Sequence, residues 1–168
     1  MKNYYTKMKL PEPLVPALQA LSLLKGQTAL VTGANSGIGR AIAVSLGRAG
    51  ANVVVNYVVK PEEAEAVVGE IQGGGGHAVA IRADVGDEAQ VVAMFAEAVK
   101  AFGTVDILVS NAGMERNAPF HEMTTAQWDA VMNVNLRGAF LCAREAVREV
   151  LGRGVRAEVS VAAGTIFF

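Results

Sequence analysis

Short apolar runs that alternate with amphipathic segments most constrain how this chain of 168 residues can fold. Runs rich in Val, Ile and Ala occur at 28–32, 52–56, 78–81 and 107–109, and they are typical of strands buried on both faces. Segments with helical periodicity follow at 38–49, 61–72 and 87–102, and a longer helix is predicted to begin at Thr124, which forms a capping box with Gln127. Because strands and helices alternate with short connections, we predict an α/β fold with a doubly wound parallel sheet.

Composition and charge exclude several classes of protein. The 15 basic and 16 acidic side chains give a net charge of -1, whereas a dedicated nucleic-acid binder usually carries a basic surplus. No apolar run approaches the roughly 20 residues that a membrane-spanning helix needs. Cys142 is the only cysteine, and His77 and His121 form no cluster with it that could bind zinc. We therefore expect a cytoplasmic protein that has no metal site and binds neither nucleic acid nor membrane.

The chain is divided into an N-terminal extension, 1–24, and one domain, 25–168. Three lysines before residue 10 precede a mostly apolar stretch, 14–24, which faintly mimics a signal peptide. Prolines at positions 11, 13 and 16 interrupt this pattern, and no A-x-A cleavage site follows. We interpret the extension as a lead-in whose leucines lie against the domain.

A glycine-rich turn, T-G-A-N-S-G-I-G at 32–39, joins the first predicted strand to the first helix. Gly33 allows a tight turn, Gly37 allows the backbone to approach a pyrophosphate, and Gly39 allows the helix and strand to pack closely. The free N–H groups of the helix N-terminus favour such an anion. Because the turn lies between a strand and a helix, we predict a dinucleotide site here. Its other predicted contacts are Asn35, Ser36 and Ile38.

The T-G-x-x-x-G-x-G spacing resembles the classical short-chain dehydrogenase/reductase family, and further motifs follow in that family's order. The segment S-N-A-G at 110–113 resembles the family's N-N-A-G, with Ser replacing the first Asn. The resemblance covers about residues 28–146 and implies a Rossmann-like fold and an NAD(P)-dependent oxidoreductase. The cofactor contacts that it implies beyond the glycine turn are Asp84, Val85, Asn111, Ala112 and Gly113.

The residues that would choose between NAD and NADP leave both possible. An acid at the end of the second strand would hold the ribose 2′-OH and repel a 2′-phosphate, but Asn56 and Tyr57 stand there. NADP-preferring relatives usually carry an arginine just beyond, where this chain has Val58. The nearest cations are Lys60 and Arg40. We expect NADP or NAD as the cofactor, with a slight preference for NADP.

The resemblance also implies a catalytic tetrad. The segment N-V-N-L at 133–136 resembles the family's N-x-N-L and points to Asn135 as the tetrad asparagine. In this family a Ser polarises the substrate and a Tyr transfers the proton. A Lys four residues after the Tyr lowers the Tyr pKa, because a tyrosine with its ordinary pKa of about 10 is a poor base at neutral pH. The only Y-x-x-x-K match is Tyr5–Lys9, before the first strand, and we interpret it as coincidental.

Two alignments of the last residues locate the fifth strand differently. If the strand is 158–162, Ser160 is the catalytic Ser, but Arg156 and Glu158 would then enter a strand buried on both faces. If the strand begins at Thr165, which we prefer, the chain ends before that Ser. The chain then resembles the first two-thirds of such an enzyme, with about five strands, an exposed sheet edge and bare apolar helix faces. We expect a marginally stable fold that associates with copies of itself or with full-length subunits.

Within the family, several loops look most like the glucose 1-dehydrogenase group. That likeness would bring Glu115 near a sugar, although we prefer an exposed carboxylate, and we interpret His121 as a loop histidine. Three functions stay open. The first is hydride transfer between NAD(P) and an alcohol, ketone or sugar, once a Tyr and a Lys are supplied. The others are a non-catalytic dinucleotide-binding module and a gene product without a role of its own. For these 168 residues alone we expect no turnover.

Overall fold

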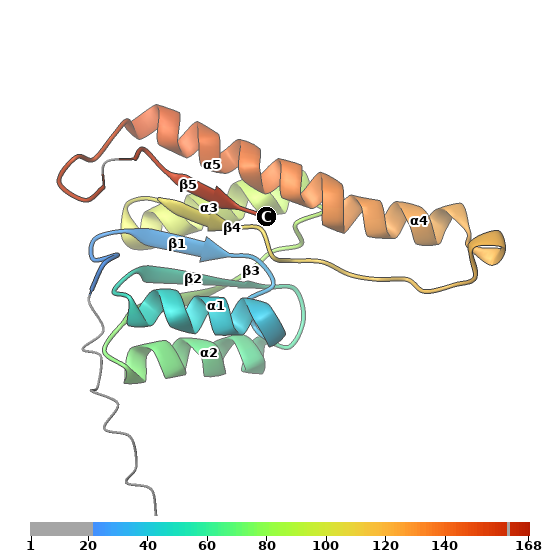
Figure 1. Cartoon of the computed structure of the whole chain (residues 1–168), viewed down its shortest axis with the longest axis horizontal. Helices are drawn as coiled ribbons and strands as arrows, with labels where there is room; N and C mark the ends of the chain where they lie inside the picture. Colours follow the sequence, from blue (N-terminus) through green and yellow to red (C-terminus); the bar gives the residue numbers. More distant parts are fainter. Residues whose placement is uncertain (1–21, 161) are drawn as a thin grey trace, which may run out of the picture.

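The computed structural model describes residues 22–160 and 162–168, and a single parallel sheet organises them. Its five strands stand in the order β3-β2-β1-β4-β5 (Figure 1). Chain order gives β1 Thr28–Val31, β2 Asn52–Tyr57, β3 His77–Arg82, β4 Ile107–Val109 and β5 Thr165–Phe167. All four strand pairs are parallel, so the predicted Rossmann-like doubly wound α/β fold is confirmed.

Helices cover both faces of the sheet. Helices α1 (Gly37–Arg48) and α2 (Pro61–Gly73) lie on one face, and α3 (Glu88–Phe102) and α5 (Ala139–Arg153) lie on the other (Figure 1). Alternate side chains of each strand therefore enter different cores: Val31 and Val53 pack with α1 and α2, whereas Leu30 and Val54 pack with α3 and α5. Burial on both faces explains why the strands appear in the sequence as continuous apolar runs.

The predicted long fourth helix is a rod of three pieces. It begins at α4 (Thr125–Met132), where Thr124 and Gln127 form the expected capping box, and it ends with α5. Between them, η2 (Asn133–Gly138) is a π-helical segment, which the sequence did not indicate. The α4 end of the rod projects past the carboxyl ends of the strands, and the loop that follows β4 runs out to it through a short 3-10 turn, η1 (Phe120–Glu122) (Figure 1).

The fifth strand forms where the preferred alignment expects it. In β5, Ile166 pairs with Leu108 and Phe167 with Val109. The alternative strand over 158–162 is wrong, because residues 157–159 form a turn and Ser160 lies outside the sheet. The physical reason lies in Arg156, whose guanidinium bonds the Asp106 carboxylate (2.7 Å) from this turn instead of entering a buried strand.

Asp106 organises the amino ends of the strands. Its carboxylate accepts hydrogen bonds from the N–H of Thr28 (2.8 Å) and from the guanidinium of Arg153 (2.8 Å), in addition to that of Arg156. Its main-chain carbonyl accepts from the N–H of Thr165 (2.9 Å). Asp106 is 7% exposed, so these partners replace the water that the charge has lost. The cluster joins the starts of β1, β4 and β5 to the end of α5.

The described chain begins inside the predicted N-terminal extension. Leu24 donates its N–H to Ala49 O (2.9 Å), and its side chain packs against the core between α1, α2 and the sheet. The predicted Tyr5–Lys9 pair lies outside the described residues. Within the described part of the chain, no helix is both long and apolar enough to cross a bilayer.

Candidate functional site

The glycine turn lies at the carboxyl end of β1, where the chain enters α1. Gly33 and Gly37 both have positive φ angles, 61° and 54°, which residues other than glycine rarely adopt. Apart from the chain neighbours of Gly37 and the backbone of its own helix, no atom lies within 4 Å of the position that a Cβ atom would take there, so a ligand can approach the backbone. At Gly39 a Cβ atom would overlap the Gly33 carbonyl oxygen. This geometry is compatible with the roles predicted for these glycines, and the approach of a pyrophosphate at Gly37 stays a prediction.

The first turn of α1 presents main-chain N–H groups to solvent. In the described residues of this turn, no side chain caps the helix and no acidic residue neutralises it. Ser36 and Gly37 are exposed, and Ile38 is 76% exposed. The positive end of the helix dipole and the free N–H groups therefore face open space, which is how helices bind phosphate.

Thr32 and Asn111 brace the turn from the β4 side. The Thr32 hydroxyl oxygen accepts from the N–H groups of Asn111 (3.0 Å) and Ala112 (2.9 Å). The Asn111 side chain donates to the main-chain oxygens of Thr32 (2.9 Å) and Gly33 (3.2 Å). Asn111 and Ala112 are half-buried and Gly113 is exposed beside them. The sequence reasoning missed the part of Thr32, although Thr is the first residue of the motif.

Asn56 turns inward at the end of β2. Its side chain is 1% exposed, its Nδ2 donates to Ala83 O (3.0 Å), and its Oδ1 accepts from Gly33 N–H (3.1 Å). This differs from the predicted position beside a ribose, because the amide is used within the protein. Tyr57 is half-buried, and its side chain packs against the core on the α1 and α2 face.

The loop after β2 stands beside the glycine turn. Asn35 donates its side-chain N–H to the main-chain oxygen of Val59 (3.2 Å), and Val58 and Val59 are both exposed. Lys60 has the left-handed φ of 59° and pairs with Glu63 (2.5 Å), which raises the pKa of the Lys60 ammonium through a hydrogen bond and charge attraction. The other candidate cation, Arg40, pairs with Glu70 of α2 (2.8 Å). It lines an open hollow together with Gly37 at the start of α1.

The segment after β3 carries the predicted Asp84 and Val85. Asp84 is half-buried and its carboxylate accepts from the Gly86 N–H (2.8 Å), whereas Val85 is buried against η2. Arg137 of η2 donates to the Gly86 carbonyl, so the π-helical segment holds this loop in place. Sequence reasoning missed Arg137, and no motif signal distinguished it.

Asn135 also belongs to η2, and it reaches the loop after β4. Its Oδ1 accepts from the Met114 N–H (2.8 Å) and its Nδ2 donates to the Met114 carbonyl (3.0 Å). π-Helical turns inside α-helices occur frequently at functional sites. Here the π-helical segment contacts both the loop after β3 and the loop after β4, and it brings Asn135 to the same edge of the sheet as the glycine turn.

Other predicted residues lie away from the glycine turn. Ser160 precedes β5 and therefore lies toward the amino ends of the strands, so it cannot act beside the glycine turn. Glu115 is exposed, and His121 in η1 is exposed with its Nε2 3.4 Å from the Glu122 carboxylate. Neither side chain contacts the turn. The remaining predicted contacts meet at the carboxyl ends of β1, β3 and β4, the edge at which open α/β sheets bind ligands.

The family described as short chain dehydrogenase matches residues 27–166. The chain belongs to this family. Among its relatives, versicolorin reductase 1 of Aspergillus parasiticus is 50% identical over 127 residues, which cover 76% of this chain and 48% of that protein. This short-chain dehydrogenase chain spans about half the length of the curated relatives it matches.

Solved structures of related proteins share the fold of this short-chain dehydrogenase. A dehydrogenase/reductase from Sinorhizobium meliloti 1021 is 46% identical, with a TM-score of 0.75 over 78% of this chain and 52% of that one. A short chain dehydrogenase from Burkholderia cenocepacia J2315, solved in complex with NADP, is 41% identical, with a TM-score of 0.73 over 75% of this chain and 51% of that one.

Proposed function

We propose that this chain is the dinucleotide-binding part of a short-chain dehydrogenase that transfers hydride between NAD(P) and an alcohol or carbonyl carbon. The observation that carries the proposal is the first turn of α1, which begins at Gly37, has no side-chain cap and faces open space. A dinucleotide pyrophosphate fits this place, because it is an anion and needs main-chain donors at close range. Bound there, the nicotinamide would supply the hydride donor or acceptor.

Other residues at the carboxyl edge of the sheet would make the remaining contacts with the dinucleotide. The loop Asp84–Val85 would hold the adenine, and the backbone of Ala112 and Gly113 would lie beside the nicotinamide half. The exposed backbone and side chains of 58–60 would face the adenosine ribose. Neither Asn56 nor Tyr57 provides a carboxylate to repel a 2′-phosphate, which favours NADP slightly over NAD. The solved relative that contains NADP supports the same preference.

Asn135 would support proton transfer by its position. Its amide is held by both polar main-chain groups of Met114, so the π-helical turn is fixed relative to the loop after β4. Turnover also needs a Tyr and a Lys that act on the substrate, and we propose that polypeptide beyond these 168 residues supplies them, from a longer chain or a second subunit. These 168 residues alone would then bind dinucleotide without turnover.

The substrate class is a carbonyl compound or the corresponding alcohol. The name of one relative, versicolorin reductase 1, favours the reductive direction. A glucose 1-dehydrogenase-like oxidation of a sugar is the alternative, and exposed Glu115 is the residue that would serve it. Both activities fit a cytoplasmic enzyme, which we propose as its location.

Calorimetric titration of the purified protein with NADP(H) and NAD(H) tests the binding proposal. Saturable binding that weakens when Gly37 is replaced by Val is the expected result. Addition of glucose or a ketone should give no change in NAD(P)H absorbance with this chain alone. Absence of binding to a cooperatively folded protein would contradict the proposed function and leave a gene product without its own role.

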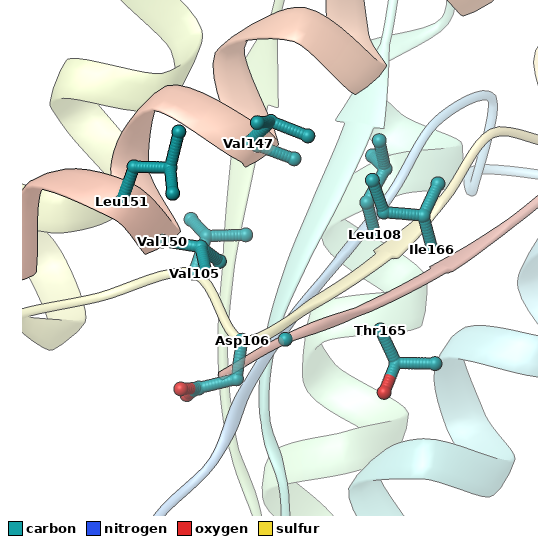
Figure 2. Close-up of a pocket in the computed structure, with 10 residues that line it drawn as sticks. Val105, Asp106, Leu108, Val147, Val150, Leu151, Thr165 and Ile166 are labelled. Carbon is teal, nitrogen blue, oxygen red and sulfur yellow. The ribbon is translucent and has the colours of Figure 1, made fainter. Parts of the chain in front are cut away.

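We also propose that the chain associates through apolar surfaces around α5. Exposed apolar side chains recur along the rod at Trp128, Leu136, Phe140 and Leu151, which we call the rod surface. Beside it, α5 and the edge strand β5 enclose a small apolar hollow of about 120 Å³. Figure 2 shows Val147 and Val150 of α5 and Ile166 of β5 around this hollow, with Asp106 at one end. Exposed apolar patches of this kind favour a protein partner, either another copy or a full-length subunit.

A further inference from the structure

Asn56 joins three strand ends at the candidate site. Its Oδ1 accepts from Gly33 N–H (3.1 Å), and its Nδ2 donates to Ala83 O (3.0 Å) and Ile81 O (3.4 Å). Its main-chain oxygen accepts from Ala34 N–H (2.8 Å). The glycine turn, the end of β2 and the end of β3 are therefore tied together through one buried residue.

The contacts require a carboxamide. One end of the group must accept a hydrogen bond from the turn, and the other end must donate to two carbonyl oxygens at the end of β3. An ionised carboxylate cannot donate, and an apolar side chain can do neither. Without the amide, the N–H of Gly33 and the carbonyl of Ala83 lose partners inside the protein, which costs more than the bonds themselves contribute.

The amide acts on the part of the turn that leads into α1. Gly33 is held from two sides, since Asn56 accepts from its N–H and Asn111 donates to its carbonyl (3.2 Å). These two bonds fix the orientation of the peptide groups on either side of Gly33. The free N–H groups of the first turn of α1 begin four residues later, at Gly37, so their direction follows from the orientation of the turn.

We propose that Asn56 is a positioning residue for dinucleotide binding: it orients the glycine turn from inside the protein and does not touch the ligand. This inference rests on the proposed function. It assigns to Asn56 a part different from ribose recognition, which then falls to the exposed residues of the loop after β2.

The test compares Asn56→Asp with Asn52→Asp in the full chain. Asn52 is the first residue of β2, so the same substitution can be made at the opposite end of the strand. There Asn52 pairs with Thr28 of β1 and His77 of β3. In Asn56→Asp, the new carboxyl would face main-chain carbonyls. The adjacent charged side chains are engaged elsewhere, Arg82 with the Val58 carbonyl and Asp84 with the Gly86 N–H. The pKa of the new carboxyl should therefore be raised, and the protonated acid can again donate to Ala83 O.

Calorimetry with NADP at two pH values gives the main result. Relative to the unchanged protein, Asn56→Asp should weaken NADP binding by about tenfold at a pH of about 8, and the deficit should shrink at a pH of about 5.5. Asn52→Asp should stay within about twofold at both values. Wild-type binding at the higher pH, or a deficit that does not change with pH, would overturn the proposal. If Asn56→Asp is unfolded at the higher pH, Asn56→Ala replaces it in the test. NADP binding that is weakened equally at both pH values would then support the proposal, and unchanged binding would overturn it.

Hydrogen exchange separates this inference from the proposed function. The Gly33 amide should be protected in the unchanged protein without ligand and should exchange faster in Asn56→Asp at the higher pH. If the unchanged protein bound no dinucleotide, the proposed function would fail. Loss of Gly33 protection in Asn56→Asp would then still support the orientation of the turn by Asn56. Equal protection in both proteins would overturn that orientation.

Discussion

The two ends of the strands in the parallel sheet differ in where their polar groups find hydrogen-bond partners. At the amino ends, Asp106 is surrounded by Thr28, Arg153 and Arg156, and all these partners belong to the chain. At the carboxyl ends, the first turn of α1 lacks both a side-chain cap and an acid within the described residues. Charges whose partners all belong to the protein stabilise the fold. Main-chain N–H groups that face open space are instead available to a ligand.

Other helix starts at the carboxyl edge sharpen the contrast. Helix α3 also begins there, but the Asp87 carboxylate accepts from the N–H groups of Ala89 (2.9 Å) and Gln90 (3.2 Å). A hydrogen bond from the Gln90 side chain, together with these two main-chain bonds, lowers the pKa of the Asp87 carboxyl. A capping acid already occupies the place where an anion would bind. The chain therefore leaves α1 open and closes α3, although both helices follow strands of the same sheet.

Gly39→Val should have the largest effect, because it breaks the carboxyl edge directly. Its Cβ would overlap the Gly33 carbonyl oxygen and lie 2.5 Å from Asn111 Nδ2, so the turn cannot keep its shape. We expect NADP affinity to fall more than a hundredfold, about 3 kcal/mol, when measured by calorimetry.

The matched control for Gly39→Val is Gly69→Val in α2, where a Cβ would meet no atom of another element within 4 Å. This variant should bind NADP as the unchanged protein does. Equal losses in the two variants would mean that the affinity depends on general stability and not on the shape of the turn.

Asp106→Asn should break the amino edge and leave the carboxyl edge intact. The neutral amide cannot balance two guanidinium groups, and removing one partner of a buried ion pair costs about 3 kcal/mol. Urea unfolding should show this loss, while Glu158→Gln, at an exposed carboxylate in the loop that contains Arg156, should change stability by less than about 0.5 kcal/mol. NADP affinity of the folded Asp106→Asn protein should change by less than about twofold. A large loss of affinity would show that the two edges are coupled.

Much of the fold, and the glycine turn at the carboxyl edge, could be predicted from the sequence. The strand positions follow from continuous apolar runs, and the glycine turn follows from T-G-x-x-x-G-x-G between a strand and a helix. The same local patterns predicted the capping box at Thr124. The position of β5 required a tertiary argument, because two segments had strand-like composition and the charges in one of them decided between the two.

The missed features depend on contacts between distant parts of the chain. Arg153 and Arg156 reach Asp106 across separations of 47 and 50 positions. The inward turn of Asn56 depends on carbonyls at the end of β3, and the π-helical segment at 133–138 depends on packing against two loops. No local propensity distinguishes an amide that faces a ribose from one that faces the interior. Such assignments therefore require the folded arrangement.

Cys142 probes the interior between the two edges. Burial, followed by the nearby Glu145 charge, raises the pKa of its thiol from 9.0 to about 12. Above pH 9 the unfolded chain loses the thiol proton and the folded chain keeps it, so stability should fall by about 1 kcal/mol per pH unit toward pH 12. Unfolding measured against pH should show a steeper fall for the unchanged protein than for Cys142→Ala. Parallel curves for the two proteins would contradict the burial of the Cys142 thiol.

Phe140→Glu tests a surface that belongs to neither edge. Phe140 lies on the rod surface and is 58% exposed, so the charge should disfavour association while the folded monomer changes by about 0.5 kcal/mol or less. Sedimentation velocity should show a shift toward monomer. Val92→Glu, at an exposed apolar position on α3, provides the control and should leave the association state unchanged. Identical sedimentation of all three proteins would contradict association through the rod surface.

Gly69→Ala should have a small effect of the opposite sign. Gly69 lies inside α2 with open space around its missing side chain, and alanine there removes backbone freedom from the unfolded chain. We expect stability to rise by about 0.5 to 1 kcal/mol in urea unfolding. If NADP affinity stays constant while stability rises, binding depends on the geometry of the carboxyl edge. If affinity rises in parallel with stability, a partly unfolded population limits binding, and the losses in Gly39→Val would need correction for that population.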